Sequence, residues 1–137
     1  MKIVIDTNVV ASAIFFGGHP RALIELVVLK KLDAYASAEI ITEYQETTEE
    51  LCNKNPEKSV KPPLTTIISA LKMIEPTSRI AVCRDPDDDI FINCAVDADC
   101  LYIVSGDKDL LSLGNYDKIQ IVTVSEFFQR YIPPTSE

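Results

Sequence analysis

Two acidic residues follow strand-like runs of apolar residues, where their carboxylates could do chemistry. Asp6 comes directly after Ile3–Ile5, and Asp107 comes shortly after Leu101–Val104. Runs that are apolar on both faces are typical of strands buried in a parallel sheet. Open α/β sheets bind ligands at the carboxyl ends of their strands, so we expect both carboxylates at one edge of the sheet. Burying unpaired carboxylates is too costly, so they must be exposed, protonated or bound to metal.

A third acid, Asp89, ends the acidic turn Cys83–Asp89. Asp6, Asp89 and Asp107 each lie at or just before a predicted helix start, where the helix dipole stabilises an anion by about 0.3–1 kcal/mol. Each of them alone is therefore also explained as a helix-start acid. Three converging carboxylates would repel one another, and a hard divalent cation such as Mg²⁺ or Mn²⁺ relieves that repulsion. The three acids together therefore predict a metal site.

A fourth candidate, Glu43, belongs to a stripe of acids on one predicted helix. The stripe consists of Glu39, Glu43, Glu46 and Glu50. Residues three and four apart share one face of a helix, so spacing alone is equally consistent with a solvated acidic face.

Strands and helices are predicted to alternate along the chain, and these elements must position the acids. This order favours an α/β fold, a three-layer α/β/α sandwich with a mostly parallel central sheet. The predicted strands are 3–5, 32–36, 73–76, 101–104 and 118–123. The predicted helices are 9–16, 21–31, 38–51, 64–72, 90–98, 108–113 and one that Ser125 would cap. The polar stretch Asn53–Pro63 is predicted to be a mobile surface loop.

Composition indicates one soluble domain, residues 1–132, with a short tail at 133–137. The chain has 137 residues, of which 47% are hydrophobic and 25% charged, which is ordinary for a globular domain. No apolar run is long enough to span a bilayer and no signal peptide is recognised, so we expect a cytoplasmic protein. Four cysteines without paired spacing, and one histidine, argue against zinc. The net charge of −8 argues against a general electrostatic grip on nucleic acid.

Four motifs, taken in order, resemble those of the PIN-domain ribonucleases, a family that includes the toxins of prokaryotic toxin–antitoxin pairs. The matching segments are Ile3–Asn8, Ser37–Tyr44, Asp85–Phe91 followed by Ala95, and Ile103–Leu111. They extend over nearly the whole chain. One departure is that Ser105 stands where the family often has threonine, which keeps the hydroxyl.

The resemblance assigns roles to individual residues. It implies four metal-binding and catalytic acids, Asp6, Glu43, Asp89 and Asp107. It implies that two polar residues either contact the metal ligands or orient the substrate, and these are Asn8 and Ser105. Two further acids, Asp88 and Asp109, could replace or assist a neighbouring ligand.

The resemblance also implies an activity and partners. It implies an endoribonuclease that uses Mg²⁺ or Mn²⁺ to hydrolyse a phosphodiester, with RNA as substrate. It further implies a small antitoxin protein as inhibitor and a homodimer, with no membrane association.

Two other functions are compatible with part of the pattern. A phosphatase could use Asp6 as nucleophile, but such enzymes need a second aspartate where Asn8 stands. A receiver domain is disfavoured in the same way, because it needs adjacent acids near the first strand and a lysine after the last one. A non-catalytic PIN-like binding module remains the second alternative, because sequence does not measure turnover.

Overall fold

The computed structural model describes residues 1–57 and 63–131. Within these residues a six-stranded sheet has the order β3-β2-β1-β4-β6-β5, so β1 and β4 are its two central strands. Neighbouring strands run parallel except β5, which is antiparallel to β6. The strands are β1 Lys2–Ile5, β2 Asp33–Ala36, β3 Lys72–Met73, β4 Tyr102–Val104, β5 Asn115–Tyr116 and β6 Ile119–Val122.

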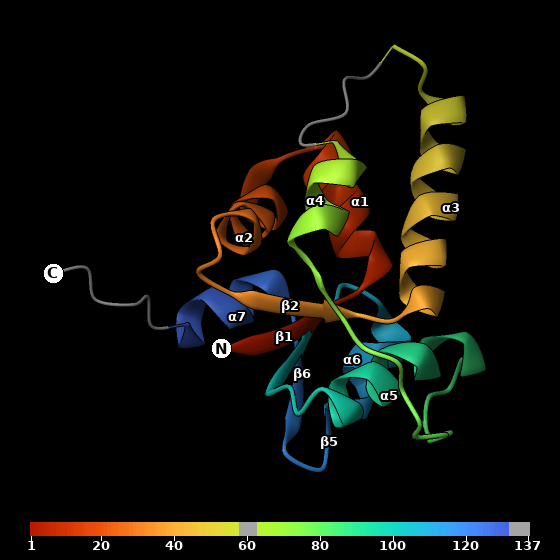
Figure 1. Ribbon diagram of the computed structural model, residues 1–137, viewed down its shortest axis with the longest axis vertical. Coiled ribbons are helices and arrows are strands. Elements are labelled where there is room, and N and C mark those ends of the chain that lie inside the picture. Colours follow the sequence, from red (N-terminus) through yellow and green to blue (C-terminus); the bar gives the residue numbers. More distant parts are fainter. Residues whose placement is uncertain (58–62, 132–137) are drawn as a thin grey trace, which may run out of the picture.

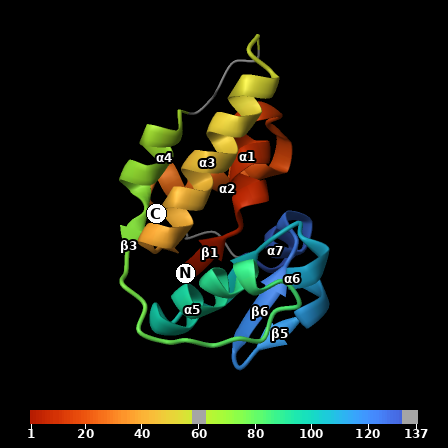
Figure 2. The ribbon, with the colours of Figure 1, turned by 90° about the vertical axis from the view of Figure 1, so that its right-hand side faces the viewer.

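Helices cover both faces of the sheet, as Figures 1 and 2 show. Helices α1, α2 and α4 lie on one side of β1, and α7 packs against α2 on that side. Helix α5 lies on the other side against β1, β2 and β4, while α3 contacts both α1 and α5. The predicted three-layer α/β/α sandwich is confirmed. The helices are α1 Thr7–Phe15, α2 Gly18–Val28, α3 Ala38–Lys54, α4 Leu64–Ala70, the 3₁₀ turn η1 Pro86–Asp88, α5 Asp89–Asp97, α6 Lys108–Leu113 and α7 Val124–Arg130.

The apolar pattern of the sequence explains why these elements pack as they do. Ile3–Ile5 and Ile103–Val104 are almost fully buried, as expected for central strands covered on both faces. On α5 the buried residues include Phe91, Cys94 and Ala95, at the predicted core spacing. On α3 the buried residues are Ile40, Tyr44 and Thr48, while Leu51 is half-buried. One stripe of α3 therefore faces the core, while Glu39, Glu46 and Glu50 are exposed and Glu43 is half-buried.

Helix caps explain where two of the helices begin. Ser37 caps α3 as predicted, because its hydroxyl accepts the amide of Ile40 at 3.3 Å. The cap predicted at Ser125 is wrong. Thr123 caps α7 instead, accepting the amide of Glu126 at 3.1 Å while the Glu126 carboxylate accepts the Thr123 amide at 2.9 Å. This reciprocal box satisfies two backbone donors and fixes the helix start directly after β6.

Other boundaries differ modestly from the predicted ones. Helix α3 continues to Lys54, so the polar stretch that follows it begins later than predicted. Residues 58–62 of that stretch and the predicted tail at 133–137 lie outside the described residues. A short antiparallel strand, β5, replaces the turn predicted at Asn115.

A helix that spans a membrane must be long enough and sufficiently apolar. In the described part of the chain, no single helix meets both criteria. Helices α1 and α2 meet them only as a pair, with an angle of 102° between them.

Candidate metal centre

Asp6 and Asp107 lie at the carboxyl ends of the two central strands. Strands β1 and β4 pair in parallel with Ile5 opposite Val104. The amide of Asp6 continues the ladder by donating to the Val104 carbonyl at 2.9 Å. Asp6 is only 3% exposed. The two predicted acids therefore meet at one edge of the sheet, as their positions after adjacent strands require.

Ser105 joins these two acids. Its hydroxyl donates to Oδ2 of Asp6 at 2.7 Å and accepts the amide of Asp107 at 2.9 Å. Ser105 is completely buried, so the hydroxyl has fixed partners on both sides. Ser105 therefore orients the carboxylate of Asp6 and the backbone amide of Asp107.

The structure brings Asp88 to these acids and turns Asp89 away. Asp88 is buried, and the negative charges of Asp107 and Asp6 both act on its carboxyl group. Asp89 accepts the amides of Val82 and Cys83 on its Oδ1, at 3.1 and 2.9 Å. Of the two adjacent aspartates, Asp88 faces the centre and Asp89 holds the preceding segment.

Asp89 is one of three polar residues along α5 that hold the extended segment leading to η1 (Figure 2). Asn93 accepts the Ile80 amide at 2.8 Å and donates to the Ile80 carbonyl at 3.3 Å. Asp97 accepts the Ser78 amide at 2.9 Å. Asp89, Asn93 and Asp97 are spaced four residues apart, so their side chains lie on one face of α5. They accept backbone amides of the extended segment, which is not part of a described strand there. This row of contacts fixes the approach of the chain to Asp88.

Glu43 reaches the same edge from α3. Its Oε1 accepts the hydroxyl of Thr7, the residue after Asp6, at 2.8 Å. Glu50, on the same predicted acidic stripe, instead pairs with Lys54 at 3.2 Å on the surface. The Thr7 contact thus distinguishes Glu43 from a residue on a merely solvated face. Sequence reasoning missed Thr7, although its position in the first turn after Asp6 was a usable signal.

An open acidic cleft of about 680 Å³ joins Glu43 to the strand ends. It is lined mostly by carboxylates, those of Glu39, Glu43, Glu46, Asp85, Asp87, Asp88 and Asp107. Because like charges concentrate here, the cleft favours cations and disfavours phosphate unless a cation is present.

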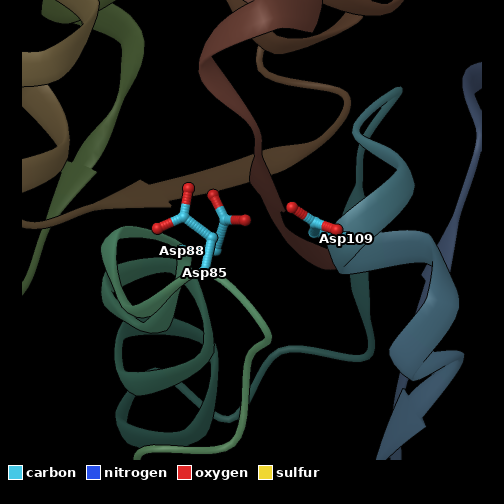
Figure 3. A group of neighbouring side chains, drawn as sticks. All are labelled: Asp85, Asp88 and Asp109. Carbon is cyan, nitrogen blue, oxygen red and sulfur yellow. The ribbon is translucent and has the colours of Figure 1, made fainter.

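Asp109 and Asp85 extend the acidic group. Figure 3 shows Asp85 and Asp88 side by side, with Asp109 opposite them. One carboxylate oxygen of each lies within 4.8 Å of the others, which is compatible with a shared cation. Asp109 also lies 3.7 Å from the guanidinium of Arg84, and its amide donates to Asp107 at 2.9 Å. Asn8, by contrast, lines a separate hollow beside Ser105.

Burial and mutual repulsion leave these carboxyl groups hard to ionise. Burial, together with the nearby charges of Asp107 and Glu43, raises the pKa of Asp6 to about 6, although the hydrogen bond from Ser105 lowers it. Burial, then the charges of Asp107 and Asp6, raise the pKa of Asp88 to about 7. Oδ2 of Asp88 is buried without a hydrogen-bond partner among the described residues. Carboxylate oxygens are the ligands that a hard divalent cation prefers, so an unsatisfied one among other carboxylates suits such a cation.

The model of the PIN domain matches residues 2–109. The chain belongs to the PIN-domain family. This match contains all the acids described above, and PIN domains are generally nucleases that use divalent metals. An uncharacterized protein of Methanocaldococcus jannaschii is 32% identical to this chain over an alignment that covers 96% of this chain and 92% of that protein.

The raised pKa values predict how the stability of this PIN domain depends on pH when metal is removed. Asp6 and Asp88 have folded pKa values of about 6 and 7 against an ordinary 3.8. Ionising them costs the folded state more than the unfolded state, so the free energy of unfolding falls as pH rises from about 4 to 7. We expect the melting temperature in EDTA to be several degrees higher at pH 5 than at pH 8.

Thermal melts of wild type and Asp88→Asn at pH 5, 6, 7 and 8 test this dependence. The variant lacks one of the two titrations and should show a flatter profile, with Mn²⁺ stabilising wild type most at pH 8. A wild-type melting temperature that is constant or rises from pH 5 to pH 8 would show that ionising these carboxyl groups does not destabilise the fold.

Proposed function

We propose that this PIN domain is a metal-dependent endoribonuclease that holds Mg²⁺ or Mn²⁺ with Asp6, Asp88 and Asp107. The observation that carries the proposal is the buried Oδ2 of Asp88, which has no hydrogen-bond partner within residues 1–57 and 63–131 and lies near two other carboxylates at the sheet edge. Glu43 completes the set from α3 through its bond to Thr7. Asp89 is not among the proposed ligands, because its Oδ1 accepts hydrogen bonds from the Val82 and Cys83 amides.

The proposed chemistry divides between the ion and the protein. When bound, the metal supplies a water of lowered pKa and neutralises charge on the scissile phosphate. The hydrogen bond from Ser105 keeps the Asp6 carboxylate in one orientation, so this carboxylate needs little rearrangement to bind the metal. Glu43 has a pKa raised by burial and then by Asp87 and Asp85, against the bond from Thr7. A carboxylate whose pKa is raised in this way is a better proton acceptor than an ordinary glutamate.

The family resemblance extends the proposal to a biological role. We propose that the chain acts in the cytoplasm as the toxin of a toxin–antitoxin pair, as a homodimer held inactive by a small antitoxin protein. The acidic cleft supports this role, because an inserted arginine or lysine would find several carboxylates there. Co-purification of a short basic protein under native expression would support this role. Purification as a monomer without a partner would argue against it.

Two alternatives are tested together with the nuclease. A phosphatase that uses Asp6 as nucleophile is disfavoured by the burial of Asp6 and by the Ser105 bond to its Oδ2. A non-catalytic binding module would retain the fold and bind RNA without turnover.

Cleavage of a mixed RNA pool by the purified protein is the test of the proposed function. Wild type and Asp6→Asn are incubated with Mn²⁺, with Mg²⁺ and with EDTA. We expect cleavage by wild type in Mn²⁺ or Mg²⁺ only, and none by the variant. Cleavage that persists in EDTA would refute a metal-dependent mechanism, and its absence with either metal would favour the binding module. Release of phosphate from an aryl phosphate would favour the phosphatase.

A further inference from the structure

The two sides of the proposed metal centre differ sharply in charge. On the side of α3 and η1, the acidic cleft is lined mostly by carboxylates. On the side of α1 and α7, a hollow of about 280 Å³ is lined by uncharged residues. The lining includes Asn8, Val9, Ser12, Pro20, Gly106 and Val124.

The hollow adjoins the metal centre through one residue. Ser105 lines the hollow, and its hydroxyl donates to Oδ2 of Asp6 at 2.7 Å. A group seated in the hollow is therefore one side chain away from a proposed metal ligand. Gly106, the next residue, is exposed, and a Cβ added there would have no atom within 4 Å.

We infer that this hollow binds a nucleobase of the substrate RNA next to the scissile phosphate. This inference rests on the proposed function and deepens it. A strand leaving the metal across the acidic cleft would place its further phosphates among carboxylates, which repel them. A strand leaving across the hollow meets no charged lining residue.

The lining of the hollow suits a base better than a phosphate. Val9, Pro20 and Val124 offer apolar surface for the flat face of a base, and single-stranded RNA can splay its bases out to use such surfaces. Asn8 and Ser12 add amide and hydroxyl groups able to pair with the edge of a base. Apolar walls with a few polar groups are typical of small-ligand pockets.

Filling the hollow from two different elements tests the inference. Gly106→Leu fills it from the loop after β4, and Ser12→Leu fills it from α1. Ser69→Leu, on the exposed face of α4, is the matched control. The readouts are the Kd of a short fluorescent single-stranded RNA in Ca²⁺, which does not require turnover, and the KM and kcat for cleavage in Mn²⁺. Mn²⁺ affinity and the melting temperature are measured beside them.

We expect both filling variants to weaken RNA binding and raise KM by about tenfold or more, which is the scale of one lost base contact. Their kcat and Mn²⁺ affinity should stay near wild type, and Gly106→Ala should have a smaller effect than Gly106→Leu. If Gly106→Leu loses Mn²⁺, Ser12→Leu decides the outcome. Wild-type Kd and KM in a filling variant that binds Mn²⁺ normally would overturn the inference. A wild-type protein that binds RNA through the hollow without cleaving it would refute the nuclease alone.

Discussion

Asp88→Asn should reduce RNA cleavage by at least about 100-fold, whereas Asp89→Asn should retain most of it. Replacing groups that merely support a metal ligand already costs about 10–100-fold, so loss of a ligand should cost more. Asp88 is buried among the acids, and no residue in the described part of the chain forms a hydrogen bond with its Oδ2. Oδ1 of Asp89 accepts two backbone amides, and the carbonyl oxygen of asparagine can still accept them.

The two variants also differ in stability, which provides a second readout. Removing the charge of Asp88 relieves repulsion from Asp107 and Asp6, so the metal-free variant should melt no lower than wild type. Asp89→Asn exchanges a charged acceptor for a neutral one and should lose about 1 kcal/mol of unfolding free energy. Cleavage rates at saturating Mn²⁺ and melts in EDTA give both results. Loss of activity at Asp89 with normal activity at Asp88 would reverse the assignment.

Glu43→Gln should lower RNA cleavage by at least about tenfold, while Glu46→Gln and Glu50→Gln stay near wild type. Among these three, Glu43 is the one joined to the strand ends, through the Thr7 hydroxyl at 2.8 Å. Glu50 pairs with Lys54 on the surface, where a substitution usually changes stability by less than about 0.5 kcal/mol. Cleavage rates of the three variants at saturating Mn²⁺ make the comparison.

Thr7→Val provides the control for Glu43. It removes the hydroxyl bond while leaving the carboxylate, so we expect a smaller loss than for Glu43→Gln. Equal cleavage by Glu43→Gln and Glu46→Gln would mean that Glu43 belongs to the solvated acidic face and not to the site.

The fold could be predicted because its signals are local. Ile3–Ile5 is apolar on both faces, which is the pattern of a strand covered by helices on both sides. The alternation of strands and helices then allows few topologies. The cap at Thr123 was also available in the sequence, since Thr123 and Glu126 have the spacing of a capping box.

The choice between Asp88 and Asp89 could not be made from the sequence. Both precede the same helix, and either could occupy the acidic position of the third motif. The structure separates them because η1 spans Pro86–Asp88 and the Val82 and Cys83 amides engage Asp89. Those amides arrive on an extended segment whose course depends on Asn93 and Asp97, and no periodicity encodes such contacts. Glu43 likewise could not be distinguished from the other acids of its stripe by sequence, because its place at the site depends on how α3 packs against α1.

The position of Mn²⁺ in crystals grown or soaked with that ion tests the central claim most directly. Anomalous scattering at the manganese edge locates the ion without reference to activity. We predict a peak bound by Asp6, Asp88 and Asp107 at the ends of β1 and β4, absent from crystals of Asp88→Asn. A peak held by Asp85, Asp88 and Asp109 without Asp6, or by Asp89, would contradict the proposed metal centre.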